Sequence, residues 1–293
     1  GVSFDIYPGE VIGLAGESGS GKSTIAQAIL RILQPPAVIT GGKVMFDGQD
    51  VLDMSDEQLA GFRWRDVSMV FQSAMNALNP VMTIGDQIID AVQAHEPMPD
   101  RKARARAEEL LQIVGIEAAR IDSYPHQLSG GMMQRAMIAT ALCCRPSLLI
   151  ADEPTTALDV TTAATILELM EQLQAEYGMA IMHITHNLGV IAEAADDVAV
   201  MYLGKLVERA DVDTLFYEPA HPYTRGLLQS VPKIGSKERL VPIKGVVPEP
   251  DAVPPGCAFS PRCPQSIEGV CNRVLPPRVD IAAGHQVLCH LYA

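Results

Sequence analysis

The sequence predicts an α/β protein built on a parallel sheet, and two observations support this prediction. Short apolar segments that suit buried strands occur at residues 11–15, 67–72, 148–151 and 179–182. Segments with helical spacing lie between and after them, as expected when helical crossovers join parallel strands. In addition, a glycine-rich stretch at residues 16–24 directly follows the first apolar segment.

Residues 1–72 are expected to form mainly strands and one helix, which covers residues 25–30. The chain begins with Gly1 rather than Met, and Val2, Phe4 and Ile6 already alternate with other residues as in a strand. We therefore expect that the chain enters in mid-domain and that some N-terminal residues precede it in the intact protein.

Residues 73–145 are predicted to form a helical subdomain. Asp100 is expected to cap a helix whose apolar residues keep helical spacing, namely Ala103, Ala107, Leu110, Leu111 and Val114. From about residue 232 the sequence becomes rich in Pro, Cys and Gly and loses periodicity. The predicted domains are therefore residues 1–231 and a C-terminal extension at residues 232–293.

Composition and charge restrict the class of partner. The 293 residues carry a net charge of −13, which argues against nucleic acid as the main partner because phosphate binding needs a basic surface. No apolar run is as long as a membrane-spanning helix, and no secretory signal opens the sequence. We expect a cytoplasmic protein that reaches a membrane only through a partner.

Residues 16–24 match the pattern of a phosphate-binding loop, Gly, four residues, then Gly-Lys-Ser. Glycines let successive N–H groups turn inward around an anion, and the helix N-terminus adds partial positive charge. Lys22 is predicted to reach the β- and γ-phosphates of a nucleoside triphosphate, and Ser23 to ligate Mg²⁺. The predicted loop residues are Gly16, Ser18, Gly19, Ser20, Gly21, Lys22, Ser23 and Thr24.

Two carboxylates, Asp152 and Glu153, end the apolar segment that starts at Ser147. A buried strand delivers its C-terminal residues to the ligand crevice of an open α/β sheet. Asp152 is predicted to hold Mg²⁺, directly or through water, and Glu153 to polarise the attacking water as general base.

Ser129, Gly130 and Gly131 form a helix start with a capping hydroxyl and exposed N–H groups. With the following Met132-Met133-Gln134-Arg135, this stretch resembles the signature motif of ATP-binding cassette proteins. Three further positions match that family: Gln72 its Q-loop, Asp159 its D-loop and His186 its switch histidine. Asn187 follows His186 where an Asp is more usual.

The resemblance implies a RecA-like phosphate-loop core, an antiparallel β part and a helical signature subdomain, followed here by the small Cys-rich extension. It implies that two cassettes dimerise head to tail, with each ATP between one phosphate loop and the signature motif of the other cassette. It also implies that Glu153, His186 and Gln72 are catalytic, that Asp159 lies at the nucleotide, and that Ser23, Gln72 and Asp152 serve Mg²⁺. The joint presence of Glu153, His186 and the stretch Ser129-Gly130-Gly131 argues against a catalytically silent cassette.

Residues 71–80, 124–128 and 221–228 are similar to the importer subfamily for oligopeptides, dipeptides and nickel. The likeness implies an ATPase subunit on the cytoplasmic face of the membrane. The implied partners are a second, homologous cassette, two transmembrane permease subunits and an extracytoplasmic solute-binding protein. Leu78 is expected to be exposed where a membrane subunit docks. The alternatives are import of nickel or another solute, or a soluble cassette without a transport role.

The last 37 residues hold Cys257, Cys263, Cys271 and Cys289, four of the six cysteines of the chain. Disulfides do not suit a reducing cytoplasm, so the four thiolates suit a structural zinc or a [4Fe–4S] cluster. The gaps of five, seven and seventeen residues lack close zinc-type pairs, and the resemblance to dipeptide-type cassettes favours the cluster. Buried free thiols are the other interpretation, which also fits Cys143 and Cys144.

Overall fold

The computed structural model describes five stretches of the chain, residues 1–72, 77–156, 158–230, 242–249 and 252–293. Contacts between residues divide the chain into two compact units. The first consists of Gly1–Ile6, Val11–Ile25 and His183–Ala293, and the second of Tyr7–Glu10 and Ala26–Met182. The predicted boundary between residues 231 and 232 lies outside the described residues.

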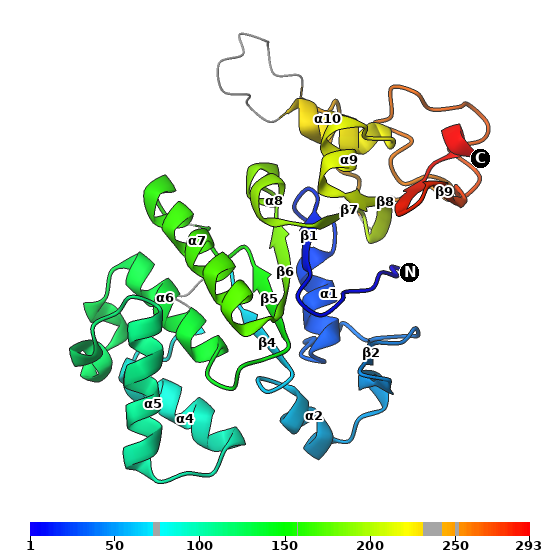
Figure 1. Cartoon of the computed structure of the whole chain (residues 1–293). Helices are drawn as coiled ribbons and strands as arrows, with labels where there is room; N and C mark the ends of the chain where they lie inside the picture. The colour runs from blue at the N-terminus through cyan, green and yellow to red at the C-terminus, as the bar shows by residue number, and fades with distance from the viewer. Residues whose placement is uncertain (73–76, 157, 231–241, 250–251) are drawn as a thin grey trace. The chain divides into compact units, whose positions relative to one another are not determined.

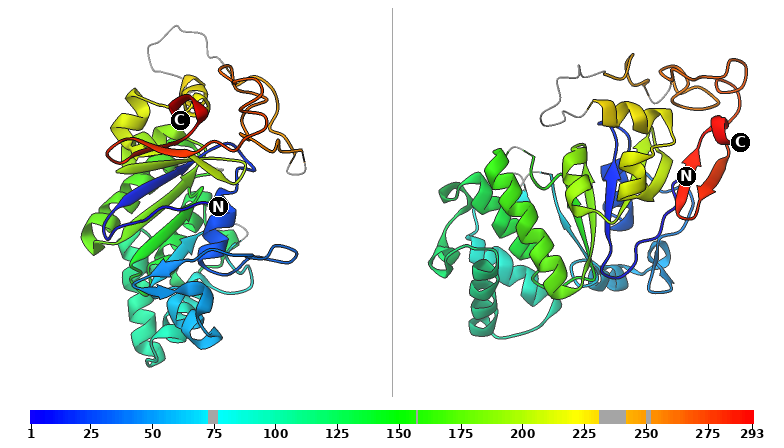
Figure 2. Two further views of the ribbon diagram at one scale, coloured as in Figure 1. Left: turned by 90° about the vertical axis from the view of Figure 1, so that its right-hand side faces the viewer. Right: turned by 45° about the horizontal axis from the view of Figure 1, so that its top comes forward.

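The first unit contains a mixed sheet with the strand order β1-β7-β8-β10-β9 (Figure 1). Its strands are β1 (Val11–Ala15), β7 (Asp197–Tyr202), β8 (Lys205–Asp211), β9 (Arg278–Ala282) and β10 (His285–Leu288). β1 is parallel to β7, and the remaining pairs are antiparallel. The red hairpin of β9 and β10 continues the sheet beyond β8, so the end of the chain is part of this unit (Figure 2).

Burial follows the apolar pattern of these strands. All five residues of β1 are buried, as are the last five of β7, which suits strands covered on both faces. The helices of the unit are α8 (Leu188–Ala194), α9 (Val212–Tyr217), α10 (Pro222–Gln229) and η4 (His290–Tyr292). Asn187, Asp211 and His221 cap the first three of them.

The second unit contains β4 (Val67–Val70), β5 (Leu148–Asp152) and the start of β6 (Ala180–Thr185), in that order. β4 and β5 are parallel, with Val67 opposite Leu148 and Val70 opposite Ala151. β2 (Met45–Phe46) and β3 (Gln49–Asp50) form a separate antiparallel pair. The chain crosses between the units at residues 182 and 183, inside β6. α1 (Lys22–Ile29) likewise begins in the first unit and ends in the second.

Helices fill residues 84–141 of this unit, as the sequence predicts for the helical subdomain (Figure 1). They are α4 (Ile84–His95), α5 (Asp100–Ile113), η2 (Ala118–Asp122), η3 (Pro125–Gln127) and α6 (Gly130–Ala141). Among the described residues, the unit also contains η1 (Val51–Asp53), α2 (Asp56–Phe62) and α7 (Val160–Tyr177). α7 starts at its cap Asp159 and ends at Gly178, whose φ of +64° suits glycine.

Two local predictions are wrong. Val2, Phe4 and Ile6 alternate in exposure with their neighbours, yet they form no strand, because in the described part of the chain no strand pairs with them. Asp100 is the first residue of α5 rather than its cap. The cap position is Pro99, and the Asp100 carboxylate accepts a hydrogen bond from Gln93 Nε2 at 2.9 Å instead.

Candidate nucleotide site

The predicted phosphate loop links β1 to α1, because the strand ends at Ala15 and the helix begins at Lys22. Gly16, Gly19 and Gly21 all have positive φ, at +148°, +79° and +98°. A side chain at Gly16 would also place its Cβ 2.3 Å from the carbonyl oxygen of Met201. These left-handed backbone angles suit glycine and are of the kind that an anion-binding loop needs, and no larger residue fits at Gly16.

The Lys22 side chain is buried within the loop. Its Nζ donates to the carbonyl oxygens of Gly16 and Glu17 at 2.7 and 3.0 Å, and to Ser20 Oγ at 3.3 Å. Ser20 is buried, Ser23 is half-buried, and Ser18, Gly19 and Thr24 are exposed. The Lys22 ammonium is thus held by three oxygen atoms of the loop itself.

The two carboxylates lie at the end of β5, in the second unit. Asp152 is 4% exposed and ends the strand, and Glu153 follows with a φ of +47°. A non-glycine residue in this left-handed region costs about 1 kcal/mol, so the surroundings must fix it. Glu153 Oε2 accepts hydrogen bonds from Gln72 Nε2 at 2.8 Å and from Thr156 Oγ1 at 2.9 Å. Gln72 and Glu153, predicted separately, therefore meet.

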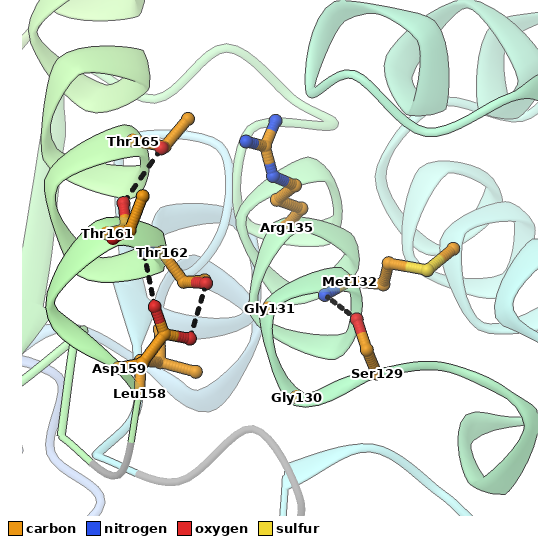
Figure 3. A pocket seen from close by; sticks show the side chains of 10 residues that line it. All are labelled: Ser129, Gly130, Gly131, Met132, Arg135, Leu158, Asp159, Thr161, Thr162 and Thr165. Carbon is orange, nitrogen blue, oxygen red and sulfur yellow. Dashed lines mark hydrogen bonds between the residues drawn. The ribbon is translucent and has the colours of Figure 1, made fainter.

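The capped glycines and the Asp159 segment line one pocket of about 430 Å³ in the second unit (Figure 3). Ser129 Oγ accepts from Met132 N at 3.3 Å and caps α6. Asp159 caps α7 by accepting from Thr162 N at 3.0 Å and Thr162 Oγ1 at 2.7 Å. These hydrogen bonds lower the pKa of Asp159, which keeps its carboxylate ionised.

Sequence reasoning missed the polar wall of this pocket. Arg135 of α6 and the hydroxyl-bearing residues Thr161, Thr162 and Thr165 of α7 line it beside the predicted residues (Figure 3). The spacing of the threonines on the helix after Asp159 is the signal that could have indicated them. Gly131 is needed for the close approach of α6 and α7, because a Cβ there would lie 2.6 Å from Thr162 Cγ2.

His186 follows β6 and belongs to the first unit, with the phosphate loop. Asn187 Oδ1 accepts from Gly189 N at 3.0 Å, and Asn187 N donates to Thr185 Oγ1 at 3.0 Å. The unusual Asn therefore caps α8 and preserves the local hydrogen bonds. His183, three residues before His186 in β6, is buried, and its Nδ1 has no hydrogen-bond partner among the described residues. Burial lowers the pKa of His183 to about 4.

Of the segment at residues 71–80 that resembles importer cassettes, residues 73–76 lie outside the described part of the chain. The expectation that Leu78 is exposed is wrong, since its exposure is 6%. The backbone turns here onto α4: Asn79 N donates to Gln87 Oε1 at 2.8 Å and Val81 N to Asn79 Oδ1 at 3.2 Å. This turn leaves Val81 79% exposed instead.

The four C-terminal cysteines lie near one another in the first unit. Cys257 N donates to the Cys271 carbonyl at 2.7 Å, and Ile267 N to Cys271 Sγ at 3.3 Å. Burial raises the pKa of Cys257 to about 11, with smaller contributions from the other three thiols. Within the described residues, no three His, Cys, Asp or Glu side chains group closely enough to hold a metal ion. Cys143 is a buried core residue as predicted, whereas Cys144 is half-buried.

Comparison with known proteins agrees with this geometry. The ABC transporter family profile matches residues 1–156, and that of the oligopeptide/dipeptide transporter C-terminal region matches residues 207–271. The chain is 47% identical over 295 residues to the dipeptide transport ATP-binding protein DppD of Bacillus subtilis, covering 99% of this chain and 88% of that protein. The oligopeptide transport ATP-binding protein AppD of the same organism is 49% identical over 300 residues, and the match covers 100% of this chain and 90% of AppD.

Solved structures show the same fold. The chain matches cbiO1 of Clostridium perfringens, part of the ABC transporter complex cbiONQ, with a TM-score of 0.64 and 30% identity over 73% of this chain and 82% of that one. The ATP-binding cassette MJ0796 was solved as a dimer in a post-hydrolysis state with ADP and Pi. It matches with a TM-score of 0.64 and 30% identity, covering 72% of this chain and 89% of that one. This chain belongs to the ABC transporter family of ATP-hydrolysing cassettes, with the oligopeptide/dipeptide-type C-terminal region. The predicted family and fold class are confirmed. In the described residues no helix is both long and apolar enough to cross a membrane.

Proposed function

We propose that this chain is the ATP-hydrolysing subunit of a peptide importer. The observation that carries the proposal is the hydrogen bond from Gln72 to Glu153, because it orients a carboxylate at the end of a buried strand in a chain that also carries a phosphate loop. The nearly full-length similarity to dipeptide and oligopeptide transport ATP-binding proteins supports peptides as the substrate class.

In this proposal, the loop N–H groups and Lys22 bind the phosphates of ATP. Ser23, Gln72 and Asp152 offer the oxygen ligands that Mg²⁺ prefers, and the ion would neutralise charge on the transferred phosphoryl group. Glu153 accepts a proton from the attacking water, and its hydrogen bonds from Gln72 and Thr156 keep the carboxylate in one orientation. His186 is assigned to the transferred phosphate, as the family resemblance implies.

The pocket formed by Ser129, Gly130, Gly131 and Asp159 is assigned to the nucleotide of a second, homologous cassette. Its support is the helix start of α6, where Ser129 leaves exposed N–H groups suited to an anion. The cassette MJ0796 was solved as a dimer bound to ADP and Pi, which supports the pairing of two cassettes. ATP would then close the pair of cassettes, and hydrolysis would reopen it.

The importer would also contain two transmembrane subunits and an extracytoplasmic solute-binding protein, and this chain would lie on the cytoplasmic face. The surface around Val81 is the proposed docking point, because the side chain is 79% exposed in the segment that follows Gln72. Replacing Val81 with Asp should reduce co-purification with the membrane subunits and leave ATP affinity unchanged. Equal recovery of the complex would reject this docking point.

The four C-terminal thiols are proposed to hold a [4Fe–4S] cluster, with zinc as the alternative metal. The support is their number, and the other three thiols lie near enough to Cys257 to contribute to its raised pKa. The thiols would have to draw closer when the cluster binds, because no three described side chains group closely enough to hold a metal ion. Chain purified without oxygen should be brown and contain iron and sulfide in equal amounts, and Cys263→Ser should remove the colour. Colourless protein that contains stoichiometric zinc would show that the metal is zinc and not iron. Metal-free protein would reject both assignments.

The proposed function is tested by purifying the chain with the proteins that accompany it and measuring phosphate release with and without Lys22→Ala. The expected complex contains membrane subunits, and its ATPase activity disappears in the variant because the cation within the loop is lost. A complex without membrane proteins, or full activity without Lys22, would reject the proposal.

A further inference from the structure

Glu17, the second residue of the phosphate loop, is held through all of its polar groups. Its N–H donates to the Tyr223 hydroxyl at 2.9 Å. Its carbonyl oxygen accepts from Lys22 Nζ at 3.0 Å and from Ser20 N at 3.2 Å. The residue that orients the loop lysine is therefore itself fixed by α10, a helix more than 200 residues further along the chain.

The Glu17 carboxylate is bound by an arginine of the C-terminal extension. Arg262 Nη1 donates to Glu17 Oε2 at 2.7 Å, and Nη2 donates to Oε1 at 3.1 Å. Such a two-pronged pair is among the stronger side-chain interactions and fixes direction as well as charge. The contact joins residues separated by 245 positions, and both belong to the first unit.

Contacts within the protein hold the Arg262 side chain in place without a bound nucleotide. Its side chain is only 4% exposed, and Nε donates to the Lys244 carbonyl oxygen at 3.1 Å. The guanidinium also lies 5.8 Å from the Tyr202 ring centre and 6.0 Å from that of Phe259. The hydrogen bonds to Glu17 raise the pKa of Arg262, so it stays charged at every physiological pH.

Three buried rings hold this arrangement together. Tyr202 at the end of β7, Tyr223 of α10 and Phe259 of the C-terminal extension lie with their centres 4.7, 5.2 and 5.3 Å apart. All three are at most 2% exposed. The cluster fixes the C-terminal extension against the two elements that support the loop, so Arg262 reaches Glu17 in a defined direction.

A carboxylate in a loop that binds phosphate is unfavourable, because like charges repel at short range in a partly buried site. Arg262 cancels that charge. We propose that Arg262 is a positioning residue for ATP binding: it neutralises Glu17 and fixes the loop, so that the C-terminal extension completes the nucleotide site. The inference rests on the proposed role of the loop at residues 16–24, and it assigns to the extension a task at the nucleotide.

The test is an equilibrium titration of the purified full chain with ATP. Arg262→Ala should raise the Kd for ATP by about ten- to a hundredfold, because an uncompensated carboxylate then faces the phosphates. Adding Glu17→Gln should bring the Kd back to within about threefold of the parent chain, since the repelling charge is gone. High salt should reduce the effect of Arg262→Ala, because it screens that repulsion.

Arg209→Ala is the matched control. Arg209 pairs with Asp197 at 2.6 Å in the same unit, and its side chain is 16% exposed, so its loss removes a partly buried ion pair outside the loop. Its Kd for ATP should equal that of the parent chain. If Arg262→Ala does not fold, Arg262→Lys keeps the charge but loses the two-pronged contact, and should give a smaller rise that Glu17→Gln again removes.

An unchanged Kd in the folded Arg262 variants would overturn the inference. So would a raised Kd that Glu17→Gln fails to restore, because that result assigns Arg262 a purely structural role. Either result leaves the proposed function intact if the parent chain binds ATP and Lys22→Ala does not. A parent chain that fails to bind ATP would overturn both.

Discussion

Replacing Glu153 with Gln separates proton acceptance from every other role of this side chain. The hydrogen bonds from Gln72 and Thr156 both end on one carboxylate oxygen, Oε2. An amide keeps one carbonyl oxygen of the same shape, so both contacts can persist while the base is lost. We therefore expect the fold and ATP affinity to remain and hydrolysis to slow.

The expected fall in kcat is about a hundredfold to ten-thousandfold, the range for removing a general base. At about 1.36 kcal/mol per factor of ten, this corresponds to roughly 3–5 kcal/mol of transition-state stabilisation. Glu153→Ala should in addition lose two hydrogen bonds worth about 1 kcal/mol each in stability.

The assay is phosphate release by the complex with its membrane partners, alongside an ATP titration. Glu168→Gln, at an exposed position of α7, is the control and should change neither quantity. A fall in kcat of less than about threefold in Glu153→Gln would refute the assignment of the base, because that is only about 0.7 kcal/mol.

Three further predictions concern the remaining parts of the molecule. Gly131→Ala should lower the free energy of unfolding in denaturant titrations by about 1–3 kcal/mol, because the new Cβ overlaps with Thr162 Cγ2. Adding Thr162→Ser removes that methyl group and should restore the stability. Failure of the second substitution to do so would contradict the proposed overlap. His221 has its pKa lowered to about 3 by burial, so its contribution to stability is present above pH 6.5 and is lost as the pH falls. Between pH 7 and pH 5, the free energy of unfolding of the parent chain should fall by about 2 kcal/mol more than that of His221→Asn. In this variant the amide oxygen can still accept the hydrogen bond from Tyr223 N that caps α10. Equal falls in the two proteins would argue against a neutral buried histidine. Ser129→Arg should leave ATP binding at the loop unchanged but abolish ATPase activity of the assembled complex, and a normal rate would exclude a composite site.

The sequence predicts the parts of the molecule in which short-range pattern and chemistry coincide. Patterns a few residues long predict the phosphate loop with Lys22, the strand before Asp152 and the cap Ser129. The structure has each of them in the predicted element. The meeting of Gln72 with Glu153 follows from the parallel pairing of β4 and β5, which brings both strand ends to one edge.

The features that sequence analysis missed depend on distant contacts. Nothing near Arg262 indicates that it binds Glu17, because the contact is created only when the C-terminal extension joins the unit that contains β7 and α10. The likeness to importer cassettes predicts an exposed Leu78 near Gln72, but the turn formed by Asn79 and Gln87 buries it and exposes Val81. Alternation at Val2 predicted a strand, although a strand also needs a partner that local sequence does not supply.

The most direct test of the central claim is uptake of a labelled dipeptide into vesicles that contain this chain, its co-purified membrane subunits and the solute-binding protein. ATP supplied on the side of this chain should drive accumulation, and Lys22→Ala should abolish both uptake and phosphate release. ATP hydrolysis that proceeds normally without uptake of any di- or oligopeptide would contradict the account.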